Sequence, residues 1–181
     1  MRYSIILAFD KKTQTAIANI REILSANGVN DDVYLPYHIT IGSVETENLA
    51  DLMKVIENYS ENQKTFKVVL SSVGTFMTPK NVVFYSPTMT VNLQMANKVL
   101  IDDLLANGFT NLDKYYLPDQ WVPHCTIVTD ITDNELQKSF EILKANNLLP
   151  FNATIDSVCV IESLKPLREY KTIATFKCQP K

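Results

Sequence analysis

The chain has 181 residues, enough for one domain or for two small lobes that share a core. Hydrophobic residues make up 46% and charged residues 20%, a balance typical of a folded globular protein rather than a disordered one. The formal net charge of −3 argues against a protein that binds long nucleic acid through its backbone, because such binding needs a basic surface.

Strands and helices alternate in the first part of the chain. A buried strand is predicted at residues 3–9, where an apolar run is bounded by charged residues. Residues 13–26 carry a helical apolar stripe, and Asn27-Gly28 ends that helix. A strand at residues 37–44 and a helix at residues 46–59 come next, so the pattern indicates a mixed α and β protein.

A hairpin and a further helix follow. Residues 65–77 and 81–86 are predicted as two strands joined by a turn at residues 78–81. The next helix extends from about residue 90 to residue 106 and ends at Asn107-Gly108.

The second half of the chain resembles the first. A strand at residues 122–129 corresponds to the strand at residues 37–44. A helix and two strands follow it in the same order, at residues 133–145, 151–161 and 170–177. We therefore predict an α+β fold in which a duplicated unit forms two lobes with antiparallel sheets, residues 1–181 making one bilobal domain.

The only two histidines of the chain lie in matching surroundings. The first is in residues 36–41 (PYHITI) and the second in residues 123–127 (PHCTI). Because alternate side chains of a strand share a face, His38 and Thr40 point to one side, and so do His124 and Thr126. If the two repeats pack by pseudo-symmetry, two imidazoles and two hydroxyls converge on one cleft.

This set of groups suits the chemistry of a phosphodiester. One imidazole can take a proton from an attacking water while the other gives a proton to the leaving oxygen. Threonine hydroxyls can donate hydrogen bonds to phosphate oxygens and orient them. Neither a metal ion nor another cofactor is needed for such a reaction.

The paired H-x-T-x motifs resemble those of the 2H phosphoesterase superfamily, which includes 2′-5′ RNA ligase-like proteins and RNA cyclic phosphodiesterases. The resemblance also rests on the proline before each motif and on the Ser-Val-Gly segment at residues 72–74. It implies a bilobal α+β fold in which each lobe contributes one motif strand to a central cleft. It also implies that His38, His124, Thr40 and Thr126 are the catalytic residues.

Other readings of the same residues are weaker. A zinc site would need further ligands with local spacing, and Cys125 should point away from His124. The three cysteines, Cys125, Cys159 and Cys178, form no CxxC pair and are expected to be inert thiols. A nucleotide-binding module without turnover, or a structural protein with incidental histidines, would not require two titratable groups in matched positions.

Aromatic residues near the motifs could stack on a base, and we expect one or two of them to contact ligand. The candidates are Phe9, Tyr37, Tyr85, Tyr115, Tyr116 and Trp121. One basic side chain could neutralise a substrate phosphate, from among Lys80, Lys114, Lys165 and Arg168.

Together these observations predict a cytoplasmic, metal-independent phosphodiesterase that acts on a 2′-linked phosphodiester. A 2′,3′-cyclic phosphate at the end of an RNA or on a nucleotide is the first substrate hypothesis, and a 2′-5′ oligoadenylate or a cyclic nucleotide signal is the second. No apolar run is long enough to span a bilayer, and the amino terminus does not form a secretory signal. The sequence does not indicate which histidine is the base or whether the protein forms oligomers.

Overall fold

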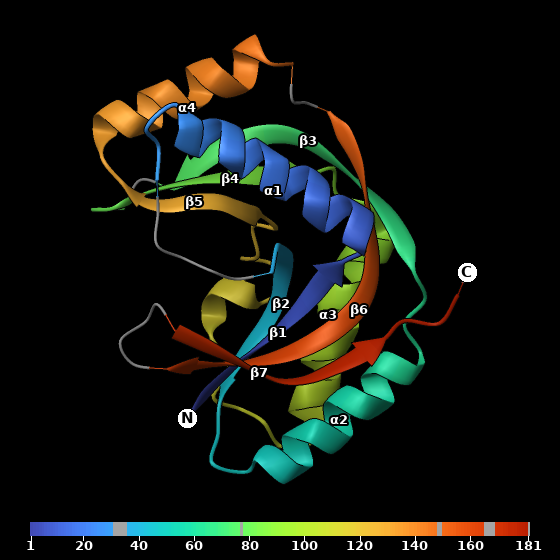
Figure 1. Ribbon diagram of the computed structural model, residues 1–181. Helices are drawn as coiled ribbons and strands as arrows, with labels where there is room; N and C mark the ends of the chain where they lie inside the picture. Colours follow the sequence, from blue (N-terminus) through green and yellow to red (C-terminus); the bar gives the residue numbers. More distant parts are fainter. Residues whose placement is uncertain (31–35, 77, 148–149, 165–168, 181) are drawn as a thin grey trace.

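A computed structural model describes residues 1–30, 36–76, 78–147, 150–164 and 169–180 (Figure 1). Its elements, in chain order, are β1 Arg2–Phe9, α1 Lys11–Ala26, β2 His38–Glu45, α2 Leu49–Glu61, β3 Phe66–Phe76, β4 Asn81–Pro87, α3 Val91–Ala106, the 3₁₀ helix η1 Lys114–Tyr116, β5 Cys125–Ile131, α4 Asp133–Ala145, β6 Phe151–Leu164 and β7 Glu169–Lys177. These confirm the strands and helices expected from the hydrophobic pattern, and η1 is additional.

In the described part of the chain, the strands form one seven-stranded antiparallel sheet. Its order is β2-β1-β6-β3-β4-β5, with β7 paired to β6. The long strand β6 joins two halves, because its residues 151–155 pair with β3 while residues 155–162 pair with β1. The two predicted lobes therefore share one continuous sheet.

Each half of the sheet is covered by two helices that are distant in sequence. Helices α2 and α3 contact each other, and they also contact β7 and β2 respectively. Helices α1 and α4 likewise contact each other, and they also contact β5 and β4 respectively. Figure 1 shows the two helix pairs at opposite ends of the molecule.

The duplication extends further than the sequence indicates. The order β1-α1-β2-α2-β3 recurs as β4-α3-β5-α4-β6, followed by β7. In this arrangement β4 is the counterpart of β1, and α3 is the counterpart of α1. Strands β2 and β5 are therefore equivalent, and each lies at one end of the strand order.

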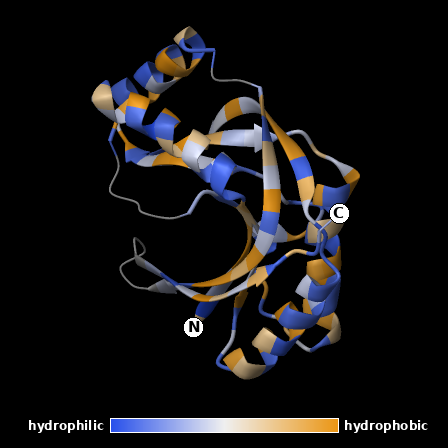
Figure 2. Cartoon of the chain, turned by 45° about the vertical axis from the view of Figure 1, so that its right-hand side comes forward, coloured by the Kyte–Doolittle hydropathy of each residue, from blue (hydrophilic) through white to orange (hydrophobic). Residues whose placement is uncertain are grey.

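Alternation along the strands separates two hydrophobic layers. Ile5 and Leu7 of β1 lie in the main core, whereas Ile6 and Ala8 lie in a small second cluster that also contains Cys159. Figure 2 shows hydrophobic and hydrophilic residues interspersed along the strands and on the helices, as the predicted stripes require. None of the helices in the described ranges has the length and apolar character needed to cross a membrane.

The Asn-Gly pairs end two helices as predicted. Asn27 is the C-cap of α1 and Asn107 is the C-cap of α3. Gly28 and Gly108, which follow them, have φ of 78° and 83°, a backbone region that glycine enters without the steric cost that a Cβ brings.

Candidate active site

The two histidines lie at equivalent places in the two halves. His38 is the first residue of β2, and His124 immediately precedes β5, which begins at Cys125. Strands β2 and β5 contact each other, although they are the two ends of the strand order. The curvature of the sheet thus brings together two motifs that are far apart in sequence.

The start of β5 corrects the sequence prediction, which placed His124 inside a strand at residues 122–129. The strand begins only at Cys125, and the carbonyl group of Val122 accepts a hydrogen bond from the His124 ring. The backbone before the strand is therefore used to hold the imidazole rather than to extend the ladder.

The register of the strands defines the face that the motif residues share. His38 pairs with Ala8 and Thr40 pairs with Ile6, and directly paired residues of neighbouring strands lie on the same face. Thr126 pairs with Phe84 in the other half of the sheet. The motif residues therefore lie on the face of the small second cluster, opposite the main core.

Both imidazoles make the same local hydrogen bond. Nδ1 of His38 lies 2.6 Å from the carbonyl oxygen of Pro36, and Nδ1 of His124 lies 2.8 Å from that of Val122. Because a carbonyl oxygen can only accept, Nδ1 carries the hydrogen in each ring. Nε2 is left as the atom of each neutral imidazole that can accept a proton.

The surroundings lower the pKa of both histidines. Burial is the largest cause for His38 and for His124, because it disfavours the charged imidazolium. The hydrogen bonds to Pro36 and Val122 act in the opposite direction. The charge of His124 also lowers the pKa of His38, which places the two rings within electrostatic range of each other.

Three aromatic rings surround His124. Their centroids lie 4.9 Å (Phe76), 5.3 Å (Phe84) and 6.2 Å (Tyr115) from the centroid of its imidazole. Phe84 lies over Gly74, where a Cβ atom would come within 2.6 Å of the Phe84 ring. Phe76 and Phe84 were not among the residues predicted from the sequence. An isolated glycine within a strand pattern was the available signal, since it indicates a close approach of another group.

Tyr116 links the first motif to η1. The side chain of Thr40 acts to lower the pKa of its phenol, which places the two side chains close together. Burial raises the pKa of Tyr116 to about 12, so that the phenol remains protonated at neutral pH. The side chain of Tyr115, which is 36% exposed, packs edge to face against both Tyr116 and His124. The short helix η1 therefore contacts both motifs.

The other aromatic residues predicted to contact substrate lie in different environments. Phe9 and Tyr85 are buried in the main core, and Trp121 is also buried, with its indole N–H donating to the Thr40 carbonyl. Tyr37 is half-buried, and its backbone N–H and carbonyl group are hydrogen-bonded to the Gln14 side chain of α1. Trp121 is therefore a buried side chain that is hydrogen-bonded to the first motif.

The remaining candidates divide between surface and interior. Lys80 forms an ion pair with Asp130 at 3.4 Å, and Lys114 is exposed on η1, whereas Lys165 and Arg168 lie outside the described residues. Burial raises the pKa of the Cys125 thiol to about 12, which leaves it an unreactive thiol at neutral pH. Among the residues that the structure describes, no three or more His, Cys, Asp or Glu side chains are grouped as metal ligands.

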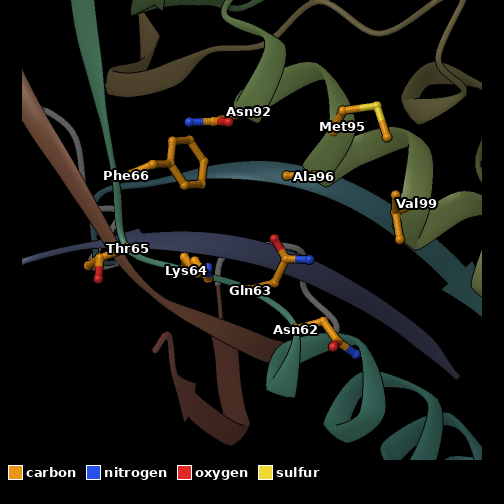
Figure 3. A pocket seen from close by; sticks show the side chains of 9 residues that line it. All are labelled: Asn62, Gln63, Lys64, Thr65, Phe66, Asn92, Met95, Ala96 and Val99. Carbon is orange, nitrogen blue, oxygen red and sulfur yellow. The ribbon is translucent and has the colours of Figure 1, made fainter. Parts of the chain in front are cut away.

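A separate cavity of about 320 Å³ lies between α2, the start of β3 and α3 (Figure 3). The polar residues 62–65 line one side of it, and α3 lines the other side mainly with apolar side chains. Its lining consists of Asn62, Gln63, Lys64, Thr65, Phe66, Asn92, Met95, Ala96 and Val99. None of these nine residues belongs to either histidine motif.

The family model of the 2′-5′ RNA ligase superfamily matches residues 9–166, which include both motifs. The chain belongs to this superfamily. The resemblance inferred from the paired H-x-T-x motifs is thereby confirmed. No curated protein matches the chain.

Several solved structures have a similar fold. The protein TT0787 of Thermus thermophilus has 14% sequence identity and a TM-score of 0.66, with 100% of each chain covered. Apo LigT of E. coli has 14% identity and a TM-score of 0.65, with 98% of this chain and 97% of that one covered. LigT complexed with 3′-AMP has 13% identity and a TM-score of 0.64, with 98% of this chain and 97% of that one covered.

These structural neighbours establish the mixed α/β fold with an open antiparallel sheet that the sequence predicts. Membership of the 2′-5′ RNA ligase superfamily, whose wider group is the 2H phosphoesterases, supports phosphoesterase activity.

Proposed function

We propose that the protein hydrolyses a 2′-linked phosphodiester, with a 2′,3′-cyclic phosphate on a nucleotide or at an RNA end as its substrate. The observation that carries the proposal is the matched pair of Nδ1-to-carbonyl hydrogen bonds, which leaves Nε2 of His38 and of His124 for proton transfer. Binding alone would not require two titratable rings held in the same way.

In this reaction the two histidines act as general base and general acid. One neutral imidazole removes a proton from a water molecule, which attacks the phosphorus atom. The bond from phosphorus to one ribose oxygen breaks, and the other histidine, protonated, gives its proton to that oxygen. The products are a phosphomonoester and a free ribose hydroxyl, so that one water molecule is consumed and no metal ion is required.

The threonine hydroxyls have the role of orienting the phosphate. Thr40 and Thr126 lie two residues beyond His38 and His124, on the same side of their strands. A threonine hydroxyl can donate its hydrogen to a non-bridging phosphate oxygen. Such neutral donors stabilise the charge that develops on those oxygens.

The substrate class is supported by the relatives and by the chemistry around His124. LigT of E. coli has been crystallised with 3′-AMP, with ATP and with NADP+, which are all nucleotides. The exposed part of Tyr115 lies beside His124 and offers a ring on which a base can stack. The name of the superfamily favours a 2′-5′ linkage as the second candidate bond.

The rate of hydrolysis is expected to have a bell-shaped dependence on pH. The base must be neutral, so kcat/KM falls as pH drops below its pKa, and the acid must be charged, so kcat/KM falls as pH rises above its pKa. Because burial lowers the pKa of both His38 and His124, the optimum should lie below about 6.5, the ordinary value for histidine.

Initial rates with a 2′,3′-cyclic nucleotide in buffers of constant ionic strength measure this profile. A flat profile, or an optimum well above neutrality, would contradict two-histidine catalysis. Nucleotide binding without any product would instead favour a binding module.

A further inference from the structure

The edge of β2 that faces away from β1 is covered by a chain segment that belongs to no strand. The segment consists of residues 111–124, which lead from the end of α3 to β5 through η1, and we call it the edge strap. At its beginning, the backbone N–H of Glu45 donates to the carbonyl of Asn111 at 3.0 Å, and that of Asp113 donates to the carbonyl of Ser43 at 2.9 Å. The strap therefore begins as a partial ladder along β2.

A buried asparagine continues this connection beyond the ladder. The side chain of Asn97 on α3 is 1% exposed. Its Nδ2 donates to the carbonyl of Ile41 on β2 and to the carbonyl of Tyr116 on the strap, both at 2.8 Å. One amide group thus fixes η1 against β2, two residues beyond the Ser43 bond.

The strap reaches the first motif through Trp121 and ends at the histidine of the second motif. The indole Nε1–H of Trp121 donates to the carbonyl of Thr40 at 3.0 Å, and the side chain is 8% exposed. Three residues after Trp121 the strap ends at His124, the last residue before β5. The strap therefore connects the two histidine motifs.

These contacts matter because the described pairings include no ladder between β2 and β5. In a ladder, repeated hydrogen bonds fix the position of one strand relative to the other. The described residues of β2 and β5 contact each other without such pairing, and the two strands are the two ends of the strand order. The strap is a second connection between the two motifs besides the sheet, and the Trp121 bond is its direct side-chain link to the first motif.

We infer that the edge strap sets the separation of the two imidazoles, and that Trp121 is a positioning residue for their reaction. This inference rests on the proposed phosphodiesterase function. Trp121 was a candidate for stacking on a base, but its buried ring and its bond to the Thr40 carbonyl assign it to the alignment of the motifs.

The variant Trp121→Phe tests this role, because it removes the N–H donor and keeps an aromatic ring. Tyr59→Phe is its matched control, since the buried Tyr59 hydroxyl also donates to one backbone carbonyl, that of Ala96 at 2.8 Å. A displacement of about 1 Å in reacting groups can cost about 10²-fold in rate. We expect Trp121→Phe to lower kcat by about tenfold or more with little change in KM, and Tyr59→Phe to leave both unchanged.

A second substitution covers the case in which Trp121→Phe does not fold. Trp121 is the only tryptophan of the chain, so a benzothiophene analogue of tryptophan supplied during expression replaces this residue alone. The analogue keeps the shape of the bicyclic ring and lacks the N–H group. It should show the same loss of kcat, and circular dichroism should show that the fold is retained.

A readout that does not depend on turnover separates this inference from the proposed function. NMR titration gives the pKa of His38 with His124 present and with His124→Gln, and the difference measures the coupling between the rings. The coupling should shrink in the Trp121→Phe background and stay unchanged in the Tyr59→Phe background. Equal coupling and equal kcat in the two backgrounds would overturn the role of Trp121, whether or not the protein proves to be a phosphodiesterase.

Discussion

His38→Ala and His124→Ala are each expected to lower kcat for a 2′,3′-cyclic nucleotide by about 10²–10⁴-fold, the contribution usual for one general acid or base. Each variant removes the only group at its position that can exchange a proton near neutral pH. The strands that carry the motifs are held by the main core, through Ile39 and Ile41 in β2, so the fold should persist. Steady-state kinetics and circular dichroism of the purified variants measure both quantities.

The double variant His38→Ala/His124→Ala sharpens this test. Groups that act as a unit are strongly non-additive, so the double variant should lose little more activity than either single one. His38→Gln is the control for volume, because it retains a polar side chain of comparable size but cannot act as a base. A single variant that keeps more than about a tenth of the wild-type rate would contradict the acid–base pair.

Gly74→Ala is expected to destabilise the protein by about 1–3 kcal/mol, the usual cost of adding a methyl group to a well-packed region. The new Cβ would lie 2.6 Å from the ring of Phe84, which is 6% exposed and packs against His124. The ring must therefore move, and it displaces the imidazole with it. We expect a loss of kcat as well as a lower midpoint of thermal unfolding.

Two further variants separate the effect on His124 from simple destabilisation. Gly108 has φ of 83° with no heavy atom within 4 Å of a new Cβ, so Gly108→Ala should cost about 1–2 kcal/mol through backbone strain alone and leave kcat unchanged. Adding Phe84→Leu to Gly74→Ala should restore part of the lost stability, because it makes room for the methyl group. Normal kcat in Gly74→Ala would show that the ring contact does not position His124.

Local patterns in the sequence were sufficient to predict the helices and strands and to recognise that the two histidine motifs match. The apolar stripe and the Asn27-Gly28 stop predict α1, and the alternation of Ile39 and Ile41 with His38 and Thr40 predicts which side chains of β2 enter the core. These features depend on residues that are close in sequence, because each is determined within a single helix or strand.

The surroundings of the histidines depend instead on pairings between distant segments. The register between β4 and β5 places Phe84 opposite Thr126, and so puts Phe84 on the face of the histidines. A register shift of one residue would put Tyr85 on that face instead. The bond from Trp121 to the Thr40 carbonyl spans 81 residues. No local pattern reveals such contacts, which is why aromatic candidates chosen for proximity in sequence proved to be largely core residues.

We propose that one pair of histidines cleaves a 2′-linked phosphodiester without a metal ion. The most direct test of this proposal is chromatography of products after the purified protein, with EDTA present, is incubated with 2′,3′-cyclic nucleotides, 2′-5′ oligoadenylate, cyclic dinucleotides and 3′-5′-linked controls. We expect cleavage of a 2′-linked substrate that is lost in His124→Ala. Cleavage that persists in that variant, or that EDTA abolishes and added zinc restores, would contradict the proposal.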